Sequence, residues 1–187
     1  MNGMKRAVLF PGIGYHCDKP LLYYSARLAR ASGYELLTVP YAGFPDRVRG
    51  DGEKLRACLE IARAQAEALL AEVNWADCRD ILFIGKSIGT AVASRYALEK
   101  DLEVRSVLLT PLAETFRFVW GSAVAFHGTA DPWADTGAIV AACRERGIPL
   151  YLTEGANHSL ETGDVRRDVE ALAAALDRID AFIKSAP

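Results

Sequence analysis

One serine of the 187-residue chain stands in a setting suited to nucleophilic chemistry. Ser87 is the middle residue of Gly85-Lys86-Ser87-Ile88-Gly89, which matches the Gly-x-Ser-x-Gly pattern. The apolar run Ile81–Ile84 predicts a buried strand before it, and Ile88–Glu99 predicts a helix after it. A tight turn between the two would expose the Ser87 hydroxyl and set the positive helix end beneath a developing oxyanion. The plainer interpretation is that Ser87 only caps this helix.

A serine nucleophile needs a histidine to take its proton and a carboxylate to orient that histidine. We predict that His158 is the base, because it lies in a polar loop between the last predicted strand and the final helix. The alternative is a solvated loop residue. We predict that Asp131, in the loop after the fifth predicted strand, is the orienting acid. Asp135 is the less favoured choice, since it could instead cap the helix that follows.

The glycines that close the first predicted strand offer accessible backbone amides. They lie in Phe10-Pro11-Gly12-Ile13-Gly14. We predict that the amide of Ile88 and the amide of Ile13 or Gly14 form an oxyanion hole. The alternative is a simple turn at the end of a strand.

Two nucleotide-binding motifs are matched only in part. Gly12-Ile13-Gly14 would need a third glycine at position 17, which is Cys17. Gly85-Lys86-Ser87 would need a glycine at position 80, which is Asp80, and a strand occupies the positions between. We therefore expect no nucleotide and no other cofactor. The four scattered cysteines also predict neither a metal site nor a disulfide framework.

Alternating strand and helix patterns extend along the whole chain. The predicted strands are Ala7–Phe10, Glu35–Val39, Ile81–Ile84, Val104–Leu109, Ala123–Phe126 and Pro149–Leu152. The predicted helices are Lys19–Ser32, Glu53–Val73, Ile88–Glu99, Thr136–Arg146 and Asp164–Ile183. This order predicts a single α/β domain over residues 1–187, with a doubly wound, mainly parallel six-stranded sheet flanked by helices. In such a sheet the reactive groups gather at the carboxyl ends of the strands.

Composition excludes several classes of partner. The net charge is −2 and no stretch is strongly basic, so we expect neither nucleic-acid nor membrane binding. The apolar run near the N-terminus stops at Pro11, which is too short for a signal peptide, and no run is long enough to span a bilayer. We expect a cytoplasmic protein with unpaired thiols. The oligomeric state is not indicated.

With these motifs the chain resembles the α/β-hydrolase superfamily over nearly its full length. The resemblance rests on Gly85–Gly89, Gly128–Pro132 and Asn157–Glu161, and on the chain order Ser, Asp, His. It is closest to the small, lidless members that are dienelactone-hydrolase-like or carboxylesterase-like. The resemblance implies a minimal fold without a cap domain that lacks the first two strands of the full fold. The chain departs from the family in having no His-Gly-Gly-Gly oxyanion motif.

Several further residues are candidates to line a pocket. They are His16, Lys86, Phe116 and Trp133. His16 is more naturally a surface histidine. The aromatic residues in 112–120 and Trp133 either cover the pocket or pack as ordinary core. Lys86 either pairs with a nearby carboxylate, the interpretation we favour, or selects an acidic substrate.

The predicted function is hydrolysis of a small-molecule carboxylic ester or thioester through an acyl-Ser87 intermediate. Two alternatives remain open at this stage. One is a non-catalytic binding or scaffold protein with the same fold. The other is an acyltransferase that uses the same site with an acceptor other than water.

Overall fold

A six-stranded parallel sheet forms the centre of the computed structural model, which describes residues 3–185. The strands are β1 (Met4–Phe10), β2 (Glu35–Thr38), β3 (Cys78–Lys86), β4 (Arg105–Leu109), β5 (Ser122–Gly128) and β6 (Leu150–Thr153). Their order is β2-β1-β3-β4-β5-β6, and every neighbouring pair is parallel. The predicted fold class is confirmed. Residues 1–2 and 186–187 of the predicted 1–187 domain lie outside the described residues.

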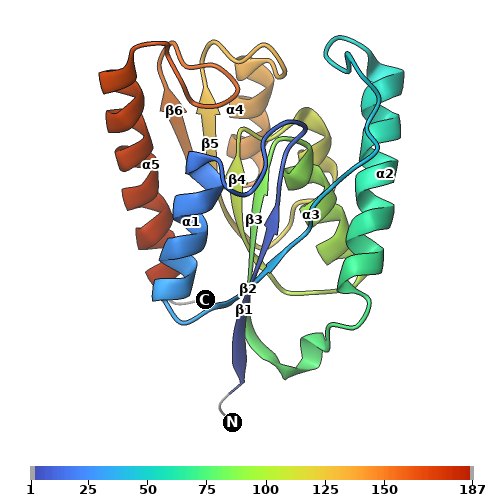
Figure 1. The fold of residues 1–187 in the computed structure, drawn as a ribbon. Helices are drawn as coiled ribbons and strands as arrows, with labels where there is room; N and C mark the ends of the chain where they lie inside the picture. The colour runs from blue at the N-terminus through green and yellow to red at the C-terminus, as the bar shows by residue number, and fades with distance from the viewer. Residues whose placement is uncertain (1–2, 186–187) are drawn as a thin grey trace.

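Helices cover both faces of this sheet (Figure 1). Two of them, α1 (Pro20–Ala31) and α5 (Val165–Lys184), pack against each other on one face. The other face carries α2 (Gly52–Leu70), α3 (Ile88–Glu99) and α4 (Thr136–Glu145). Two short 3₁₀ helices, η1 (Trp75–Asp77) and η2 (Ala113–Arg117), interrupt the connections.

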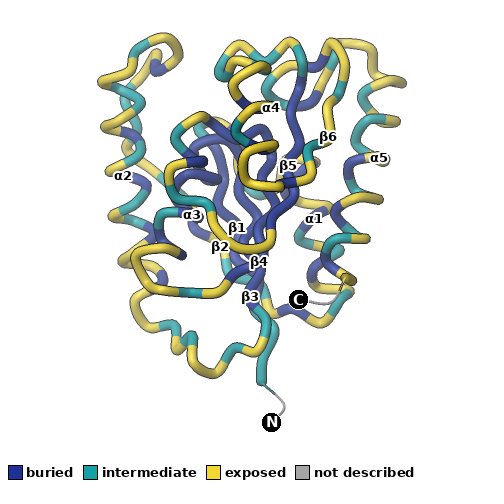
Figure 2. The backbone as a smooth tube through the Cα atoms, turned by 180° about the vertical axis from the view of Figure 1, so that it is seen from behind, coloured by how far each residue is buried: buried dark blue, intermediate teal, exposed yellow. Residues whose placement is uncertain are grey.

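Alternation along the buried strands divides the core into two layers. In β1, Ala7 and Leu9 face the α1–α5 layer, whereas Val8 and Phe10 face the α2–α3 layer. Figure 2 shows the central strands buried between helices whose outer surfaces are exposed. Because helices cover both of their faces, these central strands contain continuous apolar runs, which is why the run pattern predicted them. The edge strands β2 and β6 are only partly buried.

The helix boundaries follow capping chemistry. Asp51 caps α2, Asp135 caps α4 through the amide of Ala138, and Asp164 caps α5. The capping role weighed for Asp135 is therefore the one it has, and its carboxylate is committed to the helix. The predicted ends differ from the observed ones by one to a few residues, with β3 differing most. β3 extends to Lys86 because it pairs with both β1 and β4.

Two of the composition-based expectations can be compared with the structure. All four cysteines are free thiols. Among the described helices, none combines the length and the apolar character needed to cross a membrane.

Candidate active site

Ser87 occupies a strained turn between β3 and α3. Its φ of 56° and ψ of −124° lie in a region that L residues rarely adopt. The surrounding structure holds it there: its amide donates to the Leu109 carbonyl, and its own carbonyl accepts from the amide and hydroxyl of Thr90. A residue forced into this conformation projects its side chain away from both the strand and the helix.

The two glycines of the pentapeptide are needed for close backbone approach. A Cβ at Gly85 would lie 2.7 Å from the Thr90 Cα, which belongs to the first turn of α3. A Cβ at Gly89 would lie 2.0 Å from the carbonyl oxygen of Phe10, at the end of β1. Side chains at these positions would push α3 away from the sheet. The pentapeptide is therefore a steric requirement of the strand-turn-helix unit.

His158 and Asp131 meet Ser87 at the carboxyl edge of the sheet. The Ser87 Oγ lies 2.7 Å from His158 Nε2, and His158 Nδ1 lies 2.6 Å from Asp131 Oδ2. The other Asp131 oxygen, Oδ1, accepts a hydrogen bond from the Trp133 amide at 2.8 Å. Since an ionised carboxylate only accepts hydrogen bonds, His158 donates through Nδ1. Nε2 is then free to accept from the Ser87 hydroxyl.

A network of short contacts holds the loop that carries His158. The Asn157 side chain accepts from the amides of Ser159 and Glu161, and the Thr110 hydroxyl donates to the His158 carbonyl at 3.1 Å. The Trp133 ring stacks on the imidazole with ring centroids 5.5 Å apart. The imidazole is thus held from its backbone and from one face of its ring.

Burial is the largest single influence on the pKa of each member of the pair. It lowers the pKa of His158 below its ordinary value, and the hydrogen bond to Asp131 opposes this while the charge of Lys86 adds to it. For Asp131, burial acts to raise the pKa, but the hydrogen bond and charge of His158 outweigh it and the pKa is lowered. At neutral pH the pair is therefore an ionised carboxylate beside a neutral imidazole, the state in which a base can accept a proton.

The predicted oxyanion amides belong to the start of α3 and to the loop after β1. Ile88 is the first residue of α3, so its amide has no acceptor within the helix. The loop after β1 passes directly over the serine: a Cβ at Gly12 would lie 3.1 Å from the Ser87 Cβ. Gly12 and Tyr15 exchange backbone hydrogen bonds, and the tight turn they close contains Ile13 and Gly14, whose φ is +68°.

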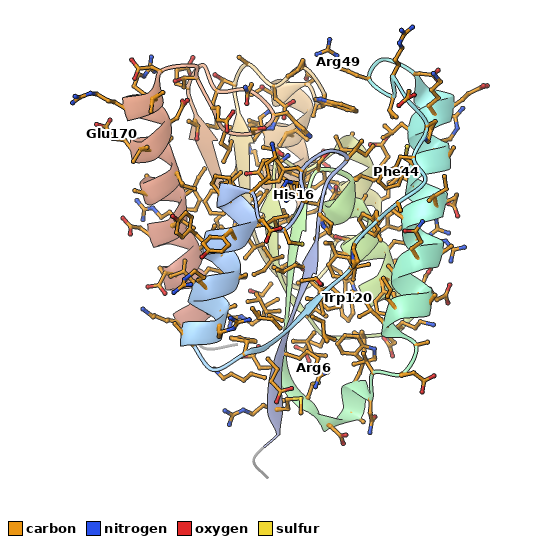
Figure 3. The ribbon with its side chains drawn as sticks, viewed as in Figure 1. Arg6, His16, Phe44, Arg49, Trp120 and Glu170 are labelled. Carbon is orange, nitrogen blue, oxygen red and sulfur yellow. The ribbon has the colours of Figure 1, made fainter. Side chains whose placement is uncertain are left out.

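The predicted pocket residues are placed differently from one another. Trp133 lies against His158, as described above. His16 has a side chain that is 66% exposed and faces Asp18, on the loop above the strand ends (Figure 3). Phe116 packs instead in the core beneath α4 with Ile139 and Cys143, so its assignment to the pocket is wrong. The hydroxyl of the neighbouring Thr115 lies 2.6 Å from the Thr90 hydroxyl.

Lys86 departs furthest from its prediction. Its side chain is 1% exposed, and no carboxylate of the described residues lies within 4.0 Å of its ammonium group. The favoured interpretation, an ion pair, is wrong. The Nζ atom instead lies 4.9 Å from the centroid of the Tyr15 ring.

Four further positions support the site, and of these Thr110 was not anticipated from the sequence. Gly12 permits the close approach to Ser87, and Thr110 holds the His158 loop. Gly128 allows this loop to pass, since a Cβ there would lie 2.3 Å from the Ala156 carbonyl oxygen. His127 Nδ1 lies 3.7 Å from Asp131 Oδ2. The two glycines carry a sequence signal, because each comes two residues after the end of a predicted strand.

The arrangement can move a proton from a hydroxyl to an imidazole. It brings together the three side chains that such a transfer needs, from three separate loops. Among residues 3–185 there is no cluster of three or more histidine, cysteine, aspartate or glutamate side chains that could hold a metal ion.

Comparisons with known proteins give information on the fold. No family model matches the chain, and no curated protein matches it in sequence. Solved structures do match. An esterase of Pyrococcus furiosus superposes with a TM-score of 0.68 at 14% identity, covering 98% of this chain and 83% of its own. Est1E from Butyrivibrio proteoclasticus gives a TM-score of 0.66 at 13% identity, with 99% and 90% covered. A lidless α/β serine hydrolase from Xanthomonas campestris gives 0.60 at 18% identity, with 99% and 85% covered.

Proposed function

We propose that this chain, which has the lidless α/β-hydrolase fold of the structures it matches, is a serine hydrolase that cleaves a carboxylic ester or thioester. The observation that carries the proposal is the continuous hydrogen-bonded path from the Ser87 Oγ to the Asp131 carboxylate, with contacts of 2.7 Å and 2.6 Å. The names of the matched esterases support the same class of reaction. Because their sequence identity to this chain is low, the structural match itself shows only the fold.

In this mechanism Ser87 attacks the carbonyl carbon of the substrate. His158 Nε2 takes the hydroxyl proton as the Ser87 Oγ–carbon bond forms, and Asp131 stabilises the resulting imidazolium. The imidazolium then gives the proton to the leaving alcohol or thiol, which leaves an acyl-Ser87 ester. Water, activated by the same histidine, breaks this ester and restores the serine.

The negative oxygen that forms during each attack needs hydrogen-bond donors. We assign this role to the amide of Ile88 together with the amide of Ile13 or Gly14. Donors that are fixed before the reaction stabilise the transition state without reorganising, and each is worth about 3 kcal/mol. The strained backbone at Ser87 serves the same end, because it presents the hydroxyl and the Ile88 amide to one point in space.

Labelling with a fluorophosphonate probe tests the proposal. We expect stoichiometric labelling of the folded protein, and none in Ser87→Ala. Ser122→Ala is the matched control, since Ser122 is exposed at the amino edge of the sheet and should label normally. Folded wild-type protein that does not react would refute the proposal and favour a binding or scaffold role. If the wild type labels as expected, a panel of acyl p-nitrophenyl esters and thioesters, with and without added alcohols, identifies the acyl group and separates hydrolysis from acyl transfer.

A further inference from the structure

A buried lysine lies directly before the proposed nucleophile. Lys86 is the last residue of β3, on the same face as Leu82 and Ile84, which belong to the layer beneath α1 and α5. Its side chain is 1% exposed, although lysine is almost never fully buried without an ion-pair partner. A volume filler at this position would more naturally be apolar.

The groups that face Lys86 come from three segments. The loop after β1 contributes the Tyr15 ring, which lies 4.9 Å from the ammonium group. The charges of Asp131 and Glu161 act on the ammonium group, and its own charge acts on His158, whose Nε2 lies 2.7 Å from the Oγ of the adjacent Ser87. His127 acts on the same pair from the other side, 3.7 Å from Asp131. Among the residues that the structure describes, Lys86 is the buried lysine, and its charge acts on the Asp131–His158 pair from within the core.

The charge of this lysine acts on His158 across a medium of low dielectric constant, where Coulomb interactions are strong. Burial lowers the pKa of Lys86 to about 7, and the Asp131 and Glu161 charges oppose this. The ammonium form is therefore present in acidic solution, where a second positive charge on His158 would be unfavourable. The two groups titrate as a coupled pair.

We propose that Lys86 is a positioning residue of the site: its buried ammonium group keeps His158 unprotonated in acidic solution and so extends the working range of the base to lower pH. The inference rests on the proposed function of Ser87 and His158. It adds the regulation of that site by a residue that does not touch the substrate.

Lys86→Met tests this inference, because methionine keeps the unbranched apolar stem of lysine and lacks its ammonium group. Lys19→Met is the matched control. The Lys19 ammonium lies 5.8 Å from the same Tyr15 ring, but this side chain is exposed. The readouts are the His158 ring resonance in an NMR titration and the pH dependence of fluorophosphonate labelling.

In Lys86→Met we expect the His158 titration to move to higher pH. The labelling rate at pH 5.5 relative to that at pH 8 should fall by about threefold or more. Lys19→Met should leave both unchanged. An unchanged His158 titration in Lys86→Met would overturn the inference, whereas absence of labelling in the wild type would refute only the proposed function. If Lys86→Met does not fold, Lys86→Gln and the wild-type titration replace it: a single, uncoupled His158 transition in the wild type would also overturn the inference.

Discussion

Replacing Lys86 by methionine should stabilise the protein, and the gain should depend on pH. Burial disfavours the charged form of Lys86 and lowers its pKa from the ordinary value of 10.5 to about 7. The charged lysine therefore destabilises the folded state. The folded state therefore binds fewer protons than the unfolded state between pH 7 and pH 10.5. The destabilisation is complete below pH 7, where both states are protonated, and it disappears as pH rises toward 10.5.

The magnitude follows from these two pKa values. The two pKa values, 10.5 and about 7, correspond to roughly 5 kcal/mol when both states are protonated. The destabilisation is still roughly 5 kcal/mol at pH 6 and falls to about 2 kcal/mol at pH 9. The contact between the ammonium and the Tyr15 ring offsets about 1 kcal/mol. Lys86→Met should therefore raise the free energy of unfolding by about 3 to 4 kcal/mol at pH 6. At pH 9 this increase should be smaller than the increase at pH 6 by about 2 to 3 kcal/mol.

Urea denaturation of wild type and Lys86→Met at pH 6, 7, 8 and 9 measures this difference. The comparison cancels the titration of those groups that do not interact with Lys86. Lys19→Met should show no such trend. A Lys86→Met protein that is less stable than wild type, or a difference that does not change between pH 6 and pH 9, would refute the argument. Either result would mean that the ammonium group has a partner strong enough to compensate for its burial.

Three other substitutions test the geometry of the site. Ser87→Gly should be more stable than Ser87→Ala by about 1 kcal/mol in urea denaturation, because glycine accepts the strained φ and ψ; equal stability would contradict strain at this turn. Asp131→Asn should fold normally by circular dichroism but label with fluorophosphonate about 10³-fold more slowly, because the amide favours the wrong tautomer of His158; a near-normal rate would exclude Asp131 as the orienting acid. Gly128→Ala should lower the free energy of unfolding by roughly 1 to 3 kcal/mol and slow labelling, since the new Cβ would meet the Ala156 carbonyl; wild-type behaviour in both assays would show that this loop is not constrained there.

The strain at Ser87 is distributed over several supporting contacts. The Leu109 carbonyl holds its amide, the Thr90 side chain holds its carbonyl, and Gly85 and Gly89 let the neighbouring backbones close around it. A conformation that costs of order 1–3 kcal/mol persists when the packing around it permits no alternative. The elbow is thus a property of β1, β3, β4 and α3 together.

Local patterns were sufficient for the architecture. Apolar runs predicted all six strands. The four central strands contain continuous apolar runs because helices cover both of their faces, whereas the edge strands β2 and β6 are only partly buried. Helical periodicity and the glycines at 33 and 147, both with positive φ, predicted where the helices lie and end. The pentapeptide around Ser87 was equally informative, because its two glycines are required by contacts within one strand-turn-helix unit. Asp131 and His158 could be chosen because polar residues that follow strands converge at one edge of such a sheet.

The surroundings of individual side chains depend on packing between segments that are distant in the chain. Lys86 was expected to find a carboxylate, yet its environment is set by β3 continuing two residues beyond the apolar run Ile81–Ile84, which turns the side chain into the α1–α5 layer. Phe116 and Trp133 are both aromatic residues in loops, but one packs under α4 and the other stacks on His158. Nothing in the local sequence distinguishes them. Residue type and spacing determine which groups lie at the edge of the sheet. The tertiary structure determines what each group contacts there, because the burial of a side chain and the distance to its partners depend on how helices and sheet pack together.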